Sequence, residues 1–77
     1  MLKKRLRLIN MREAKGLSQA SAAKRLNIST PHLCDIENGK KSPSLILALK
    51  LAKLYGEDVT KLFEEDYSQI FFTRELA

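Results

Sequence analysis

The chain has 77 residues, of which 44% are hydrophobic and 30% charged, and its formal net charge is +5. This length predicts one small domain, and the composition is that of a folded globule rather than a disordered chain. No apolar run approaches the roughly 20 residues of a membrane span, and a single cysteine excludes an internal disulfide, so we expect a cytoplasmic protein.

Positive charge is concentrated in the first half of the chain. Residues 1–41 contain ten Lys and Arg against three Asp and Glu, a net charge of +7. Residues 42–77 contain four against six, a net charge of −2. Such an asymmetry indicates a polyanionic partner, either nucleic acid or an anionic membrane surface.

Residues 2–15 contain no Gly or Pro and place apolar side chains at helical spacing. This pattern predicts a first helix that ends near Gly16. Two interpretations of its basic start, Lys3 to Arg7, stay open: a solvated end or a group of phosphate contacts. Binding of this helix to a membrane is disfavoured, because its apolar stripe is needed for the core.

The next part of the chain predicts two short helices joined by a tight corner. Ser18 is a good N-cap for a helix over 19–26, and Asn27 suits the left-handed residue that closes such a helix. Ser29 can cap the second helix, which ends before Gly39.

The second of these helices separates its residues by face. One face is apolar apart from a single carboxylate, and it carries Leu33, Ile36 and Glu37. The opposite face is small and mostly polar, and it carries Pro31, Asp35 and Asn38, flanked by His32 and Cys34. The polar face is therefore expected to meet a polar partner, and Glu37 to need a cation.

Two more helices follow. Ser44 can cap a helix over 45–55, which is apolar on nearly every side. We expect this helix to be the buried centre of the core and to have more apolar surface than its short neighbours need. Gly56 ends it. Asp58 can cap a short last helix over 59–63.

Residues 64–77 form a tail with an acidic start and an apolar cluster, Ile70-Phe71-Phe72. Because exposed Phe residues are a liability on a free monomer, we expect this tail to cover Leu47 and Leu54. The cover can come from the same chain or from the partner of a dimer, and disorder is the remaining alternative.

A set of spaced positions runs through most of the chain: Arg12, Gly16-Leu17-Ser18-Gln19, Ala23, Leu26, Ile28-Ser29, Ile36-Glu37-Asn38-Gly39-Lys40, Pro43-Ser44-Leu45 and Leu62. Together, over about residues 6–63, they resemble the helix-turn-helix domain of the Cro/phage-repressor (XRE) family. Three positions depart from the family pattern: Ala22 where Leu is common, Asn27 in place of the usual turn Gly, and Glu57 where Val is common. None of them contradicts the fold.

The resemblance implies an all-α, five-helix, lambda-repressor-like DNA-binding domain over residues 1–63. A short C-terminal extension, residues 64–77, would pack on the domain or make a dimer contact. The third helix would enter the major groove of double-stranded DNA. Base contacts would come from Thr30, Pro31, His32 and Asp35, and phosphate contacts from Gln19, Asn38 and Lys40. Arg12 and Glu37 would form a buried ion pair between the first and third helices.

Single residues of the polar face have alternative interpretations. Asp35 accepts a hydrogen bond from a cytosine amino group, or it faces solvent or a nearby basic residue. His32 donates to a base or a phosphate, or it is a surface imidazole, and Cys34 is a small filler. With one His and one Cys on different sides of the helix, we expect no metal and no other cofactor.

The leading hypothesis is a sequence-specific transcription regulator, such as a repressor, that binds a palindromic operator as a homodimer. The dimer surface is expected on the fourth helix, the tail and three further residues, Val59, Leu62 and Phe63. The alternative is an antitoxin-like DNA-binding module whose hydrophobic tail binds a partner protein. We expect no enzyme activity, because the sequence offers no nucleophile–base pair and no metal cluster.

Overall fold

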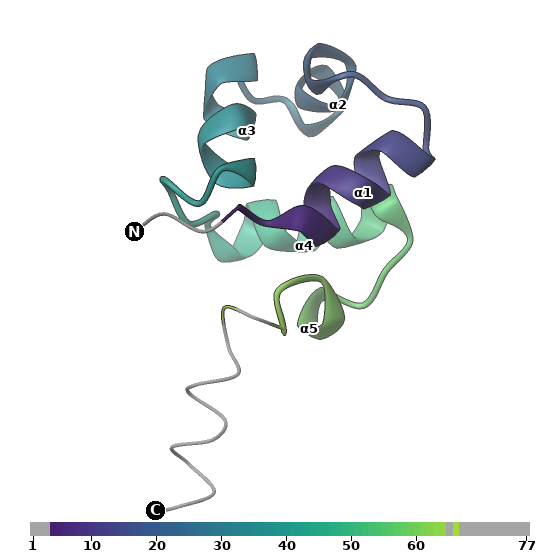
Figure 1. Ribbon diagram of the computed structural model, residues 1–77, viewed down its shortest axis with the longest axis vertical. Coiled ribbons are helices and arrows are strands. Elements are labelled where there is room, and N and C mark those ends of the chain that lie inside the picture. The colour runs from purple at the N-terminus through teal and green to yellow at the C-terminus, as the bar shows by residue number, and fades with distance from the viewer. Residues whose placement is uncertain (1–3, 65, 67–77) are drawn as a thin grey trace, which may run out of the picture.

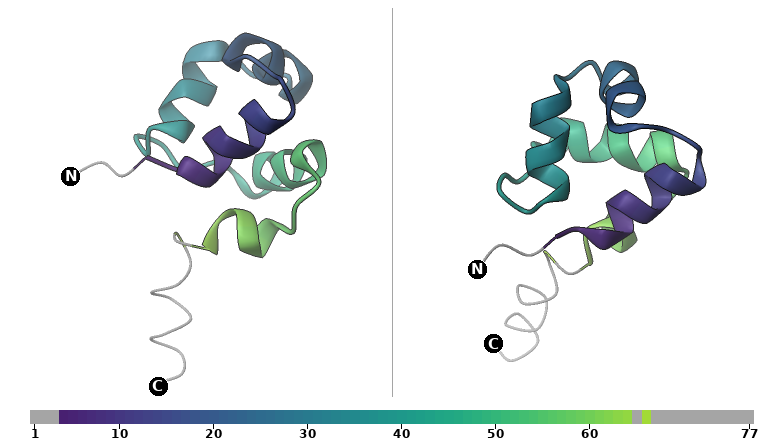
Figure 2. Two further views of the ribbon diagram at one scale, coloured as in Figure 1. Left: turned by 45° about the vertical axis from the view of Figure 1, so that its right-hand side comes forward. Right: turned by 45° about the horizontal axis from the view of Figure 1, so that its top comes forward.

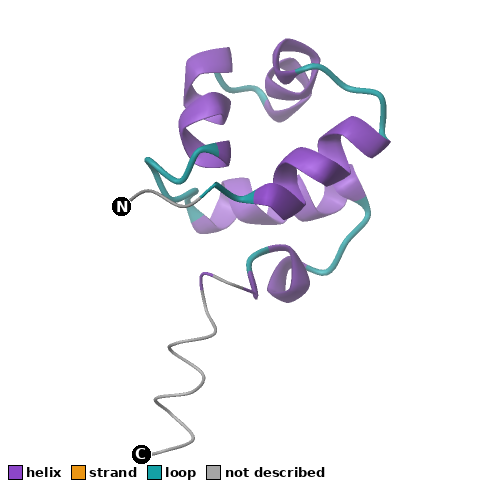
Figure 3. Ribbon diagram, in the orientation of Figure 1, coloured by secondary structure: helices purple, strands orange, loops and turns teal. Residues whose placement is uncertain are grey.

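The computed structural model describes residues 4–64 and 66, and in that part of the chain it contains five α-helices and no strand (Figures 1 and 3). The helices are α1 (Leu6–Ala14), α2 (Gln19–Leu26), α3 (Thr30–Glu37), α4 (Leu45–Tyr55) and α5 (Val59–Leu62). None of these described helices combines the length and the apolar character that crossing a bilayer requires. The prediction of an all-α, five-helix domain is confirmed.

The four predicted N-cap side chains each accept a hydrogen bond from a backbone N–H of the following turn. The distances are 3.0 Å for Ser18, 3.2 Å for Ser29, 3.2 Å for Ser44 and 2.9 Å for Asp58. These bonds satisfy donors that have no partner within the helix, so α2 to α5 begin where the local sequence predicts. Asn27 has a φ of 59° and closes α2 in the left-handed conformation, also as predicted.

The first helix is shorter than predicted, because α1 begins at Leu6 rather than at residue 2. The cause is a long-range contact of the residue before it. The backbone N–H of Arg5 donates to the carbonyl oxygen of Glu37 at 2.8 Å. This bond holds Arg5 against the end of α3 and outside the helix.

The core is built from all five helices and the residue that follows α5. Its buried hydrophobic members are Leu8, Ala22, Ala23, Leu26, Leu33, Ile36, Leu47, Ala48, Leu51, Tyr55, Leu62 and Phe63. α1 and α4 run through the middle, with α2 and α3 on one side and α5 on the other (Figures 1 and 2). The two buried alanines let α2 lie close to its neighbours, so Ala22 is compatible with the fold although it departs from the family pattern.

α4 is not buried on every side, in line with the predicted surplus of apolar surface, but the surplus does not lie at Leu47 and Leu54 as predicted. Leu45, Ile46 and Leu49 are 71%, 69% and 50% exposed, and we call them the α4 patch. Leu47, which was expected to need cover from the tail, is buried and Leu54 is half-buried. Apolar residues on every side of a helix allow it to be fully buried, but burial also requires a packing partner on each side. The predicted cover by residues 70–72 lies outside the described residues.

Candidate nucleic-acid interface

α3 has a buried face and an accessible face, as its sequence predicts. Leu33, Ile36 and Glu37 are buried in the core. Four residues of α3 were predicted to contact bases. Pro31 is exposed, and Thr30, His32 and Asp35 are half-buried. The structure therefore leaves all four side chains at least partly accessible, and their contact with bases stays a prediction.

Behind this accessible face, Arg12 of α1 and Glu37 of α3 form an ion pair. Arg12 Nε donates to Glu37 Oε2 at 2.8 Å, and Arg12 Nη2 donates to Oε1 at 3.3 Å. The two side chains are 11% and 1% exposed. The hydrogen bond to Glu37 raises the pKa of Arg12 above its ordinary value. The pair thus joins the first and third helices inside the core.

Gln19, which was predicted to contact phosphate, is bonded to the same carboxylate. Its Nε2 donates to Glu37 Oε1 at 3.0 Å, a contact that the sequence analysis did not predict. An amide nitrogen carries two N–H groups, so one remains to donate to a phosphate oxygen. Gln19 is also the first residue of α2, where unpaired backbone N–H groups and the helix dipole favour an anion.

Asp35 lies next to a basic residue, which was one of its alternative interpretations. Its Oδ2 is 3.8 Å from Lys41 Nζ, and both side chains are partly exposed. Such a pair contributes little stability and can open. The backbone carbonyl of Asp35 accepts the N–H groups of Lys40 at 2.8 Å and Lys41 at 3.3 Å. These bonds fold the chain after α3 back onto the helix.

Asn38 and Lys40, the other predicted phosphate contacts, lie in this turn after α3. Asn38 Nδ2 donates to Cys34 Sγ at 3.2 Å, which leaves its second N–H for another acceptor. Lys40 is exposed. We call residues 38–41 the α3 turn.

Two cations of the basic start, Arg5 and Arg7, form contacts within the chain, which neither interpretation of Lys3 to Arg7 predicted, and Lys3 lies outside the described residues. The Arg5 side chain is 12% exposed and bonds to the Asp66 carboxylate and to two backbone carbonyls. Arg7 Nη1 lies 3.5 Å from Glu57 Oε2. No local pattern distinguishes Arg5 from the basic residues around it, so the sequence held no signal for this role.

Tyr55 brings an unpaired hydroxyl close to the ion pair. The residue is 2% exposed, and its hydroxyl has no hydrogen-bond partner among the described residues. Burial, helped by the charge of Glu37, raises the pKa of Tyr55 to about 12. The hydroxyl therefore stays neutral beside Arg12 and Glu37 at physiological pH.

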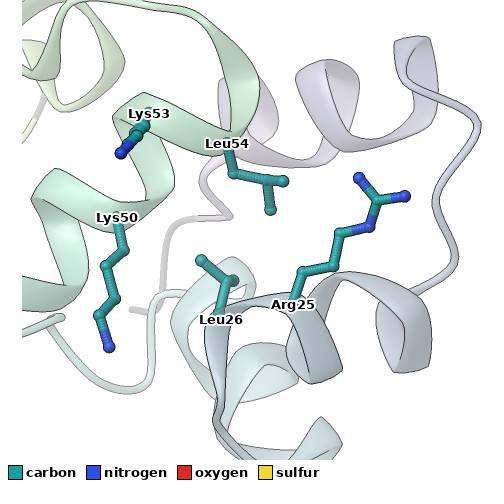
Figure 4. Close-up of a pocket in the computed structure, with 5 residues that line it drawn as sticks. All are labelled: Arg25, Leu26, Lys50, Lys53 and Leu54. Carbon is teal, nitrogen blue, oxygen red and sulfur yellow. The ribbon is translucent and has the colours of Figure 1, made fainter.

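A groove between α2 and α4 adds positive charge. It has a volume of about 300 Å³ and is lined by Arg25, Leu26, Lys50, Lys53 and Leu54 (Figure 4). None of its three cations forms an ion pair with another residue in the described part of the chain. The groove lies near the end of α2 opposite Gln19, so it strengthens the long-range attraction of a polyanion rather than the candidate interface itself.

The arrangement of α2, the corner at Asn27 and the accessible α3 is that of a helix-turn-helix domain. Comparison with known families supports this conclusion. Residues 8–62 match the helix-turn-helix family of the XRE type, and the chain belongs to it.

Three relatives illustrate this membership. An uncharacterized HTH-type transcriptional regulator of Methanocaldococcus jannaschii is 42% identical over 48 residues, which are 62% of this chain and 73% of the relative. The HTH-type transcriptional regulator DdrOP3 of Deinococcus deserti is 40% identical over 58 residues, 75% of this chain and 45% of that protein. The propionyl-CoA carboxylase regulator of Cereibacter sphaeroides is 38% identical over 64 residues, 83% of this chain and 14% of that protein. The chain therefore spans less than half the length of the last two.

The family match confirms the predicted resemblance. It makes the chain a DNA-binding domain of the kind found in transcription regulators. This membership, rather than any missing feature, supports the expectation that the chain is not an enzyme.

Proposed function

We propose that the chain regulates transcription by binding a specific sequence of double-stranded DNA with α3 in the major groove. The observation that carries this proposal is the division of α3. Its inner face holds Glu37 in a buried ion pair, while its outer face leaves four chemically different side chains accessible. The major groove of B-DNA admits an α-helix, and the net charge of +5 supplies attraction that is independent of sequence.

The accessible residues of α3 offer different chemistry to base edges. Asp35 can accept from a cytosine amino group once Lys41 turns from it toward a phosphate. The methyl group of Thr30 can contact a thymine methyl, and His32 can donate to a base or a phosphate. Pro31 presents only apolar surface.

Phosphate contacts would fix the orientation of α3 on the duplex. Gln19 would supply the N–H that its bond with Glu37 leaves free, and Asn38 the N–H that its bond with Cys34 leaves free. Lys40 would supply a positive charge. These residues come from the first turn of α2 and from the α3 turn, and the bond between Gln19 and Glu37 places both segments at the C-terminal end of α3.

We further propose that two copies bind a palindromic operator. One module of this kind buries roughly 600–1,000 Å², which is little for tight and selective binding. Two copies on half-sites about 10 bp apart would double that area. The α4 patch is the candidate dimer surface, because contiguous exposed apolar residues mark interaction sites. Leu62 and Phe63, which the sequence analysis assigned to this surface, are 4% and 2% exposed and belong to the core instead.

The proposal is tested by selecting bound sites from random double-stranded DNA with the purified protein. It predicts enrichment of a palindrome with two half-sites about one helical turn apart. Enrichment of no sequence would refute specific recognition. Enrichment of a single asymmetric site would refute the homodimer and leave recognition by α3 in place. A dimer bound across a promoter would act as a repressor by occupancy.

A further inference from the structure

Arg5 joins three segments that are far apart in the sequence. Its Nε and Nη2 donate to the Asp66 carboxylate at 3.1 to 3.3 Å. Its Nη1 donates to the carbonyl oxygens of Ile36 at 2.6 Å and Lys41 at 2.9 Å. Its backbone N–H donates to the carbonyl of Glu37. One residue therefore contacts the end of α3, the α3 turn and the chain beyond α5.

These contacts stabilise the end of α3. The last carbonyl groups of a helix lack donors within the helix and carry partial negative charge, which favours a cation. Arg5 supplies donors to Ile36 and Glu37, and its positive charge lies beside them. Because Nη1 also bonds to Lys41, the guanidinium spans both ends of the α3 turn. Asn38 and Lys40 lie between those ends.

Asp66 determines which way the guanidinium points. Its carboxylate takes the Nε and Nη2 edge of Arg5, and that arrangement aims Nη1 at the carbonyls of α3 and the α3 turn. Without Asp66, the side chain would gain freedom to turn into solvent. The carboxylate is thus the partner that keeps a flexible side chain in one orientation.

The same geometry argues against Arg5 as a phosphate ligand. Its Nε–H, both N–H groups of Nη1 and one of Nη2 are occupied within the chain, and the side chain is 12% exposed. A phosphate would have to displace several charge-assisted hydrogen bonds. Any effect of Arg5 on DNA binding must therefore act through the residues that it holds.

We propose that Arg5 is a positioning residue for the α3 turn, and that Asp66 controls DNA affinity through Arg5 without touching DNA. The inference rests on the proposed DNA binding and adds a point of control to it. Any contact that draws Asp66 away from Arg5 makes the α3 turn less ordered. The phosphate contacts of Asn38 and Lys40 then become weaker. Asp66, which lies beyond α5, thereby acquires influence over the α3 turn, from which it is separated by the Arg5 side chain.

The test compares Asp66→Asn with Glu64→Gln. Each substitution removes one negative charge, and Glu64 is exposed. General electrostatics predicts that both variants bind DNA more tightly, because the net charge rises equally. The inference predicts tighter or unchanged binding for Glu64→Gln and binding weaker by about three- to tenfold for Asp66→Asn. The salt dependence of Asp66→Asn should also be shallower, because phosphate contacts are lost.

A second matched pair removes the cation. Arg5→Ala and Arg7→Ala each delete one positive charge near the start of α1, but Arg7 is 50% exposed and, among the described residues, pairs with Glu57 alone. Arg5→Ala should reduce DNA affinity more than Arg7→Ala. The DNA affinity of Arg5→Lys should lie between those of the two alanine variants, because Lys keeps the charge without the planar guanidinium group.

Amide hydrogen exchange of the free protein tests the effect of the Arg5–Asp66 contact on the α3 turn in the absence of DNA. The N–H groups of Lys40 and Lys41 should exchange faster in Asp66→Asn than in Glu64→Gln, since their bonds to Asp35 depend on an ordered α3 turn. Equal exchange in the two variants, or equal DNA affinity, would overturn the inference. A wild-type protein that binds no DNA would instead overturn the proposed function, whatever the exchange rates show.

Discussion

Gln19 and Glu37 are joined by a hydrogen bond of 3.0 Å that connects the start of α2 with the end of α3. Glu37 is also the partner of Arg12, so one buried carboxylate links the ion pair of the core to a residue proposed to contact phosphate. The stability of the domain and the geometry of its proposed phosphate contact at Gln19 therefore involve the same group.

Removal of either partner of the ion pair is predicted to destabilise the protein strongly. Arg12→Ala and Glu37→Ala each leave a charge buried without its partner, which should lower the free energy of unfolding by about 3–5 kcal/mol. The measurement is urea denaturation followed by circular dichroism. Thr30→Ala is the control, because an accessible α3 residue should change stability by no more than about 0.5 kcal/mol. Small and equal shifts in all three variants would contradict a buried pair.

Loss of the Gln19 side chain is predicted to weaken DNA binding without changing its sequence preference. A phosphate contact carries no base information, so Gln19→Ala should reduce affinity by a similar factor on the selected operator and on unrelated DNA. Lys40→Ala should do the same and also reduce the slope of log affinity against log salt by about one. A changed base preference in Gln19→Ala would show that the phosphate assignment is wrong.

The helix limits were predictable where the signals are local. Ser18, Ser29, Ser44 and Asp58 are each a few residues from the N–H that they accept, and each cap forms as expected. The start of α1 was not predictable, because it depends on a bond between Arg5 and Glu37, which lie far apart in the chain. The surplus apolar surface of α4 was predicted but assigned to the wrong residues for a related reason, since a uniformly apolar helix does not reveal which of its sides lacks a neighbour.

The Tyr55 hydroxyl is predicted to make stability fall at high pH. Burial raises its pKa from 10.0 to about 12, so the folded state holds the proton over a range in which the unfolded chain has lost it. Stability from this group is complete below pH 10 and is lost as the pH rises toward 12. The melting temperature of Tyr55→Phe should therefore fall less steeply than that of the wild type between pH 10 and 12. The variant should also be at least as stable at pH 7, because it removes an unpaired buried hydroxyl.

That comparison also controls for other groups that titrate at high pH, since every lysine is retained in both proteins. Identical pH profiles for the wild type and Tyr55→Phe would show that Tyr55 ionises as readily in the folded state as in the unfolded chain.

A charge in the α4 patch is predicted to disrupt the dimer. Leu49→Lys places a cation among Leu45 and Ile46, so sedimentation velocity should show a monomer where the wild type is a dimer. Leu6→Lys is the matched control, because Leu6 is 61% exposed on a different helix. A dimer that survives Leu49→Lys, or a wild type that is already a monomer, would exclude this surface.

The two faces of α3 were predictable from the sequence, whereas two contacts around the candidate site were not. The spacing along α3 separates the accessible face from Glu37, which needs a cation as a buried carboxylate, and the family resemblance implies that the cation is Arg12. Nothing local indicates that Gln19 shares that carboxylate or that Arg5 meets Asp66, because both contacts depend on how separate helices are packed.

Recognition of bases by the accessible face of α3 is tested most directly by site selection with two variants side by side. With Asp35→Ala, the preferred sequence should change at one position in each half-site while the rest of the palindrome is kept. With Lys40→Ala, the preferred sequence should be that of the wild type and only the affinity should fall. An unchanged preference in Asp35→Ala, together with unchanged preferences in Thr30→Ala and His32→Ala, would contradict the reading of DNA by α3.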